Sequence, residues 1–166
     1  MAPIRIGLLR HAKSSWSDPD LEDHARPLAP RGRRAASSMG EYLRREELEP
    51  DLVLCSSAVR ACQTCELLGL TPQTEILVED RIYRATATGL LDRLRSISSA
   101  TRSALLIGHN PAIQEAAISL ATDPAALTGK FPTAALAQFL LPDTEWRELQ
   151  PGVARLASFV LPRNLS

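Results

Sequence analysis

The sequence lacks an excess of charge of either sign. Its 19 Lys and Arg residues equal its 19 Asp and Glu residues in number, so the formal net charge at pH 7 is zero. No overall electrostatic field therefore draws the chain to nucleic acid or to anionic lipid, and we expect neither as a partner. Affinity for an anion has to come from a local group of cationic side chains.

Long apolar runs are missing as well. The apolar run near the N-terminus holds only about six residues before Arg10, which is shorter than the apolar region of a signal peptide and far shorter than a membrane span. We therefore expect a cytoplasmic protein that does not interact with a membrane. A chain of 166 residues can bury one core but is short for two, so we expect residues 1–166 to form a single domain.

Cysteine is scarce and odd in number. Cys55, Cys62 and Cys65 are clustered, which does not suit the disulfide framework of a secreted protein. Cys62 and Cys65 form a Cys-x-x-Cys pair, but no second pair of Cys or His at a suitable spacing completes a zinc site. We interpret the pair as small core residues of a helix, and we expect no metal ion and no other cofactor.

The sequence does contain short apolar segments that alternate with segments of helical periodicity. The alternation predicts an α/β fold with a mostly parallel sheet covered by helices on both faces. The last two strands have no helix between them, which predicts an antiparallel pair at one edge. Strands are predicted from residue 4 up to Arg10 and at 51–55, 75–78, 103–107, 135–141 and 153–161, helices at 31–47, 58–68, around 90–97 and after Pro111, and irregular segments at 79–83 and 123–132.

Two of the predicted strands end on a histidine. The first leads into Arg10 and His11, and the fourth leads into Gly108 and His109. An Arg-His pair after a strand is, taken alone, more often the start of a solvated loop than a catalytic site. Open α/β sheets place their ligand sites at the carboxyl ends of strands, so two such blocks predict that both imidazoles meet at one edge.

Adjacent first, second and fourth strands would bring Arg10, His11, Arg60 and His109 together. Guanidinium groups bind phosphate oxygens through paired, charge-assisted hydrogen bonds and stay protonated at physiological pH. A neutral imidazole is a nucleophile near pH 7 when its other nitrogen keeps its proton on a backbone acceptor. The set predicts phosphoryl transfer to His11 without a metal ion, with His109 donating a hydrogen bond in the transition state.

Three other side chains are weaker candidates for substrate binding. Ser14 and Ser57 could each donate to a phosphate oxygen, although capping of a helix is the favoured role for Ser57. Arg26 either lines the mouth of the site or is an ordinary surface arginine. His24 lies in a polar loop, and we expect it to be solvated.

The segments Leu9-Arg10-His11-Ala12-Lys13-Ser14, Ser56 to Thr64 and Gly108-His109-Asn110-Pro111 together resemble the histidine phosphatase superfamily. The short Arg-His-Ala segment is similar to that of the SixA-type phosphohistidine phosphatases. The resemblance spans nearly the whole chain and includes Asp23 and residues 26–28, 31–32 and 132–135.

The resemblance implies a three-layer α/β/α sandwich with a mostly parallel six-stranded sheet. It also implies that His11 carries the phosphoryl group as a covalent intermediate. Arg10 and Arg60 would clamp that group, and His109 would be the second histidine of the pocket.

Two differences from the family pattern indicate which branch of the superfamily the chain resembles. Ala12 stands where many members have glycine, which favours the smaller branch over the mutases. Many members also supply a carboxylic acid to the leaving alkoxide, and Glu79 and Asp80 are candidates in the right region, although both could be ordinary loop charges. A phosphorylated imidazole needs less protonation to leave than an alkoxide, which is consistent with a phosphohistidine substrate.

We therefore predict a metal-independent phosphatase that acts through phosphohistidine on His11, with a phosphorylated protein as its substrate. One alternative is a phosphatase or mutase for small molecules such as sugar phosphates or nucleotides. A second alternative, of a different class, is a phosphate-binding module without catalytic activity. The presence of both histidines and both arginines favours catalysis over the binding module.

Overall fold

A computed structural model describes residues 2–165 and contains one six-stranded sheet. Its strands are β1 (Ile4–Arg10), β2 (Leu52–Ser56), β3 (Glu75–Glu79), β4 (Ser103–Gly108), β5 (Leu136–Leu141) and β6 (Arg155–Val160). Strands β1 to β4 are parallel, β5 runs antiparallel to β1, and β6 runs antiparallel to β5. The predicted parallel sheet with an antiparallel C-terminal pair is confirmed. The strand order across the sheet is β3-β2-β4-β1-β5-β6.

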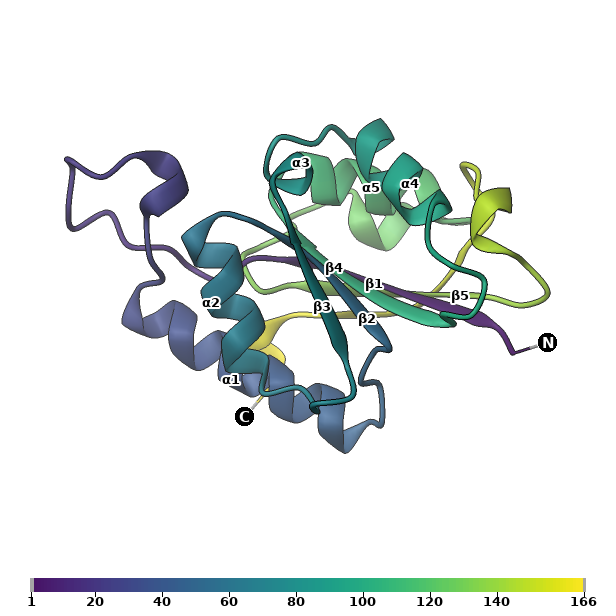
Figure 1. Cartoon of the computed structure of the whole chain (residues 1–166), viewed down its shortest axis with the longest axis horizontal. Coiled ribbons are helices and arrows are strands. Elements are labelled where there is room, and N and C mark those ends of the chain that lie inside the picture. Colours follow the sequence, from purple (N-terminus) through teal and green to yellow (C-terminus); the bar gives the residue numbers. More distant parts are fainter. Residues whose placement is uncertain (1, 166) are drawn as a thin grey trace.

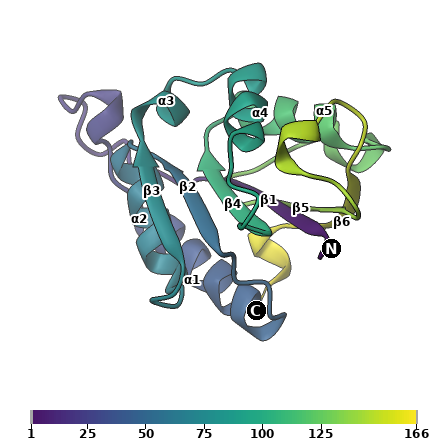
Figure 2. The same ribbon diagram turned by 45° about the vertical axis from the view of Figure 1, so that its right-hand side comes forward.

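Helices cover both faces of the sheet, which confirms the three layers (Figures 1 and 2). One face carries α1 (Pro30–Arg45) and α2 (Val59–Leu68), and the other carries α4 (Ala87–Arg95) and α5 (Ala112–Leu120) with the short α3 (Asp80–Tyr83) beside them. Single turns of 3-10 helix lie at Asp23–Ala25, Ala125–Leu127, Trp146–Glu148 and Pro162–Asn164. No helix within residues 2–165 is both long enough and apolar enough to cross a membrane.

The central strands are mostly apolar because both of their faces are buried. In β1, Ile6 and Leu8 pack in the cluster that includes α4 and α5, whereas Leu9 packs in the cluster that includes α1 and α2. Strand β4 repeats this alternation with Leu106 and Ile107. Since β2, β4 and β1 are neighbours and parallel, their carboxyl ends meet at one edge, which is the adjacency that the predicted site requires.

The segment 79–83 is the clearest error in the predicted elements. Glu79 is the last residue of β3, and Asp80–Tyr83 form a one-turn helix instead of a loop. Ile82 is 3% exposed and packs in the core. One turn is too short for helical periodicity to show in a sequence, and the tertiary burial of Ile82 stabilises it.

A close contact between α1 and the segment after β1 holds the chain that follows His11. The Ala29 N–H donates to the Lys13 carbonyl oxygen at 2.9 Å, just before α1 begins. A side chain on Gly32 would overlap that same carbonyl oxygen, so only glycine permits the approach. The first turn of α1 therefore fixes the path of the backbone two residues beyond the histidine.

Candidate active site

The edge formed by β1, β2 and β4 brings the four principal candidate residues together. Arg10 ends β1, His11 follows it, Arg60 lies in the first turn of α2, and His109 follows β4. The two imidazole centroids are 5.0 Å apart. Arg60 bridges them, with Nε 3.4 Å from Nε2 of His11 and Nη2 3.3 Å from Nδ1 of His109.

The orientation of His11 is set by its own backbone. Its Nδ1 lies 2.7 Å from the carbonyl oxygen of Ala12, which can only accept, so Nδ1 carries the proton and Nε2 keeps a lone pair. Ala12 is held in turn because its N–H donates to Oγ1 of Thr64, whose hydroxyl donates to the carbonyl oxygen of Arg60. The helix that carries Arg60 thus also positions the nucleophile.

Burial keeps His11 neutral. The residue is 7% exposed, and desolvation lowers the pKa of its imidazole to about 3 even though the hydrogen bond to Ala12 acts in the opposite direction. The neighbouring charges of His109, Arg60 and Arg10 lower the pKa of His11 further. A neutral ring retains its nucleophilic lone pair at neutral pH.

Both ring nitrogens of His109 form hydrogen bonds. The guanidinium of Arg60 can only donate, so Nδ1 of His109 accepts and Nε2 carries the proton, which it donates to Oγ of Ser56 at 2.7 Å. Ser56 is fully buried, and its Oγ also accepts from the Ala58 N–H at 3.1 Å. Desolvation, and then the charge of Arg60, lowers the pKa of His109 to about 4.

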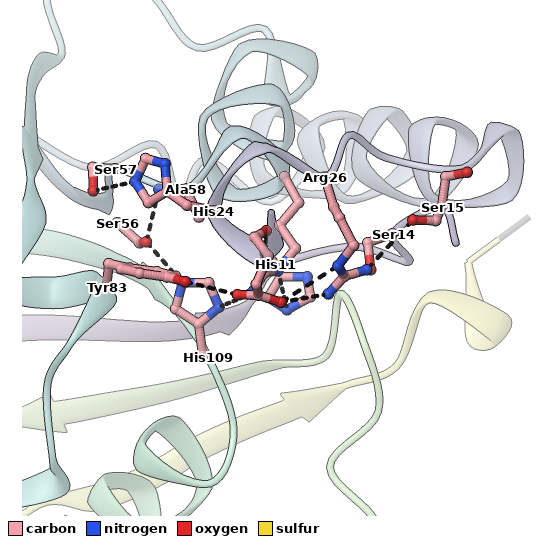
Figure 3. Close-up of polar contacts among 12 residues, drawn as sticks. His11, Ser14, Ser15, His24, Arg26, Ser56, Ser57, Ala58, Tyr83 and His109 are labelled. Carbon is pink, nitrogen blue, oxygen red and sulfur yellow. Dashed lines mark hydrogen bonds and ion pairs between the residues drawn. The ribbon is translucent and has the colours of Figure 1, made fainter. Parts of the chain in front are cut away.

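Ser56 is a site residue that was not predicted from the sequence. It ends β2 at the same sheet edge at which Arg10 ends β1, so the position of a hydroxyl residue at a strand end is the signal that could have found it. Figure 3 shows Ser56 next to His109, while Arg26 lies on the other side of His11.

Asp23, which was predicted only as part of the family resemblance, joins two of the site's arginines. Its Oδ2 accepts from Nη2 of Arg60 at 3.0 Å and from the hydroxyl of Tyr83 at 2.8 Å, and its Oδ1 accepts from Nη2 of Arg26 at 3.0 Å. Partial burial by itself would raise the pKa of Asp23, but these three hydrogen bonds outweigh it and hold the pKa well below its usual range. The carboxylate is therefore ionised at neutral pH.

Tyr83 was also missed. It lies in the one-turn helix α3, and its ring contacts the rings of both His24 and His109 at centroid distances of 4.7 and 5.5 Å. A tyrosine in a segment expected to be a loop carries no sequence signal that would assign it to the site.

Arg26 and Ser14 are buried together. Arg26 is only 6% exposed, donates from Nη1 to Oγ of Ser14 at 2.6 Å, and has the ring of Trp16 over its guanidinium at 3.6 Å. It is therefore not an ordinary surface arginine. Its link to Arg60 runs through Asp23, whose two oxygens each accept from one of the two guanidinium groups.

Ser57 does not cap a helix, which corrects the favoured role. The N-cap residue of α2 is Ala58, and no side chain caps it. Ser57 instead donates to Oδ1 of Asp80 at 2.8 Å and lies 2.9 Å from Nε2 of His24. His24, which we expected to be solvated, therefore has a partner and packs edge-on against Tyr83.

The two candidate acids lie in different surroundings. Glu79 accepts from Nε and Nη2 of Arg93 on α4 at 2.8 and 2.9 Å, and also from Arg81. Asp80 is exposed at the rim, where Ser57 and Arg84 donate to it. Hydrogen bonds from these partners lower the pKa of both carboxyl groups, so both are ionised at neutral pH.

The irregular segment 123–132 is anchored to the site. The carbonyl oxygen of Phe131 accepts from Nη1 of Arg10 at 3.0 Å and from Nδ2 of Asn110 at 3.1 Å. Gln114 on α5 donates to the carbonyl oxygens of Leu127 and Gly129. Within residues 2–165, no group of three or more His, Cys, Asp or Glu side chains is arranged to hold a metal ion.

Comparison with known proteins agrees with this geometry. The sequence profile of the histidine phosphatase superfamily (branch 1) matches residues 6–86. An uncharacterised protein of Mycobacterium tuberculosis is 36% identical over 162 residues, which cover 93% of this chain and 100% of that protein.

Two solved structures superpose over nearly the whole chain. A protein from Nakamurella multipartitia, provisionally named phosphohistidine phosphatase SixA, matches with a TM-score of 0.88 and 26% identity over 98% of each chain. A protein from Agrobacterium tumefaciens with the same provisional name matches with a TM-score of 0.82 and 30% identity over 98% of this chain and 100% of that one. The chain belongs to the histidine phosphatase superfamily, in its SixA-type branch, and is a phosphatase.

Proposed function

We propose that this phosphatase removes the phosphoryl group from phosphohistidine side chains of proteins through a covalent intermediate on His11. The observation that carries the proposal is the hydrogen bond between Nδ1 of His11 and the carbonyl oxygen of Ala12 at 2.7 Å. It fixes the tautomer and directs the lone pair of Nε2 toward Arg60. A buried, neutral and oriented imidazole has the properties of a phosphoryl acceptor.

In the first step, Nε2 of His11 forms a bond to phosphorus while the bond from phosphorus to the substrate nitrogen breaks. The leaving imidazole keeps the electron pair and takes a proton from solvent. Arg10 and Arg60 offset the charge on the phosphoryl oxygens. Nε of Arg10 is buried without a hydrogen-bond partner among the described residues, and a phosphoryl oxygen would satisfy this donor.

In the second step, water forms a bond to phosphorus and the bond to Nε2 of His11 breaks, which releases inorganic phosphate. His109 stabilises both transition states by donating from Nδ1 to a phosphoryl oxygen. A bound phosphoryl dianion offsets the charge of Arg60 that lowers the pKa of His109, so binding favours uptake of this proton. The doubly protonated ring then donates to Ser56 and to the phosphoryl group.

The carboxyl groups near the site favour phosphohistidine over alkyl phosphates as the substrate. Asp23 is ionised and occupied by three donors, Glu79 is bound to Arg93, and Asp80 is exposed at the rim. None of the three holds a proton at neutral pH to give to a leaving alkoxide. An imidazole leaving group depends less on such an acid, which supports a phosphoramidate substrate.

The test compares wild type with His11→Ala on an aryl phosphate in the presence of a metal chelator. The aryl group leaves with little protonation, so the assay reports on the nucleophile alone. We expect turnover to fall by about 10⁴-fold or more in the variant. Wild type incubated with labelled phosphohistidine peptide should form an acid-labile, base-stable phosphoenzyme, and His24→Ala should still form it.

Two outcomes would contradict the proposal. Undiminished turnover by His11→Ala would exclude the covalent route. A higher kcat/KM for sugar phosphates or nucleotides than for phosphohistidine peptide would keep the route but assign a small-molecule substrate.

A further inference from the structure

A basic cavity lies beside the active site and has no part in the chemistry described above. Its volume is about 580 Å³, and it is formed by residues from the segment after β1, from α1, from the segment before β5 and from the C-terminal segment. Figures 1 and 2 both show the C-terminal segment beside α1. The cavity is lined by five exposed cationic side chains, those of Lys13, Arg31, Arg34, Lys130 and Arg163.

These cations are unbalanced. No Asp or Glu lines the cavity, and within residues 2–165 none of the five forms an ion pair. The chain as a whole has no net charge, so the concentration is local. A concave surface lined with charge of one sign focuses the field and attracts ligands of the opposite sign.

The cavity and the catalytic pocket share a wall. Lys13 follows His11 by two residues, and Pro132 and Thr133 line the cavity. The neighbouring Ala134 N–H donates to the carbonyl oxygens of Arg10 and His11 at 2.9 and 3.1 Å. A ligand in the cavity would therefore lie against the backbone that carries the nucleophile.

The lining also contains apolar surface. Leu161, Pro162, Pro132 and Ala35 lie among the cations. A single phosphate ion needs neither this volume nor apolar contacts. A peptide segment with several carboxylates and some apolar side chains matches both the charge and the size.

We propose that this basic cavity docks an acidic segment of the protein substrate, next to the phosphohistidine that enters the catalytic pocket. The inference rests on the proposed function, because it names the partner of the same site. Exposed ion pairs are individually weak, so docking depends on several of them together and is sensitive to salt. Its main effect is on KM and on the rate of association, not on kcat.

The experiment uses two phosphohistidine peptides that differ only in flanking residues, Glu in one and Gln in the other. At low ionic strength we expect wild type to show a KM about tenfold lower for the Glu peptide. Arg34→Glu/Arg163→Glu should remove or reverse this preference and leave the Gln peptide unaffected. The matched control is Arg33→Glu/Arg45→Glu, which makes the same charge change at exposed α1 residues outside the cavity and should keep the preference.

Peptide binding is measured separately from dephosphorylation, so that the docking site and the proposed function can each be contradicted without the other. Fluorescence anisotropy with the unphosphorylated Glu peptide reports docking even if neither peptide is dephosphorylated, a result that would overturn only the proposed function. Equal binding of the Glu and Gln peptides to wild type would overturn the docking site. Tighter binding of ATP than of the Glu peptide, lost in Arg34→Glu/Arg163→Glu, would also overturn it and assign the cavity to a nucleotide.

Discussion

The catalytic pocket and the basic cavity are both rich in cations, but they hold them in opposite ways. In the pocket, Arg26 and Arg60 are each 6% exposed and are held by Asp23 at 3.0 Å. In the cavity, Arg34 and Arg163 are exposed and have no ion-pair partner among the described residues. Buried, paired cations are already in place for a transition state, whereas exposed, unpaired cations attract a ligand without orienting it.

Substitution of Arg60 tests the difference between the pocket and the cavity most directly. Arg60→Lys should lower kcat/KM for an aryl phosphate by about 10²–10³-fold, because a lysine cannot contact His11, His109 and Asp23 together from one planar group. Arg34→Lys keeps the charge of the cavity and should change kcat/KM by less than about twofold. Steady-state kinetics of both variants measures these effects. A similar loss of kcat/KM in both variants would contradict the difference between the pocket and the cavity.

Acid should destabilise the protein largely through the two histidines of the pocket. The pKa values of His11 and His109 are about 3 and about 4 in the folded state, against 6.5 for an ordinary histidine. Above pH 6.5 both histidines are neutral in the folded and in the unfolded chain, so their burial costs no stability through protonation. As the pH falls through 6.5, the unfolded chain binds two protons that the folded chain does not, so stability falls by about 2.7 kcal/mol per pH unit between roughly pH 5.5 and 4.5.

Urea denaturation at a series of pH values measures this slope. We expect a much smaller slope for His11→Gln/His109→Gln and an unchanged slope for Arg34→Glu/Arg163→Glu. A double glutamine variant with the wild-type slope would show that other groups cause the acid sensitivity.

A substitution at Gly32 tests the role of the backbone that lies between the catalytic pocket and the basic cavity. Gly32→Ala places a methyl group against the carbonyl oxygen of Lys13, so the segment after His11 has to move. We expect the free energy of unfolding to fall by about 1–3 kcal/mol, with a loss of activity. Gly129→Ala is the matched control because nothing lies within 4 Å of its added Cβ, and equal denaturation midpoints for both variants would contradict the assigned contact.

Ser56→Ala should have the smallest effect of the four. The variant leaves Nε2 of His109 and the Ala58 N–H without their acceptor. We expect kcat for an aryl phosphate to fall about tenfold with KM nearly unchanged, and the pH profile of kcat to shift as the pKa of His109 changes. Ser57→Ala, at the half-buried neighbouring residue, should lose less activity, and an unshifted pH profile would leave Ser56 with a structural role only.

Much of the fold could be predicted because the signals are local. The apolar runs of β1, β2 and β4 and the helical periodicity of α1 and α2 appear directly in the sequence. The one-turn helix α3 could not be predicted, because burial of Ile82 against distant residues stabilises it. The capping role expected for Ser57 was wrong because α2 begins one residue later, leaving that hydroxyl to His24 and Asp80.

The sequence by itself determined four candidates, namely the nucleophile His11, the two arginines Arg10 and Arg60 and the second histidine His109. Each of them ends or follows an apolar strand or lies at the start of the helix after such a strand. Only the tertiary structure decided that Asp23, Ser56 and Tyr83 join them, since their partners lie 37 to 60 residues away in the chain. It also decided that scattered cations from four segments gather into one cavity. Distances across the fold depend on strand order and packing, and neither composition nor periodicity encodes them locally.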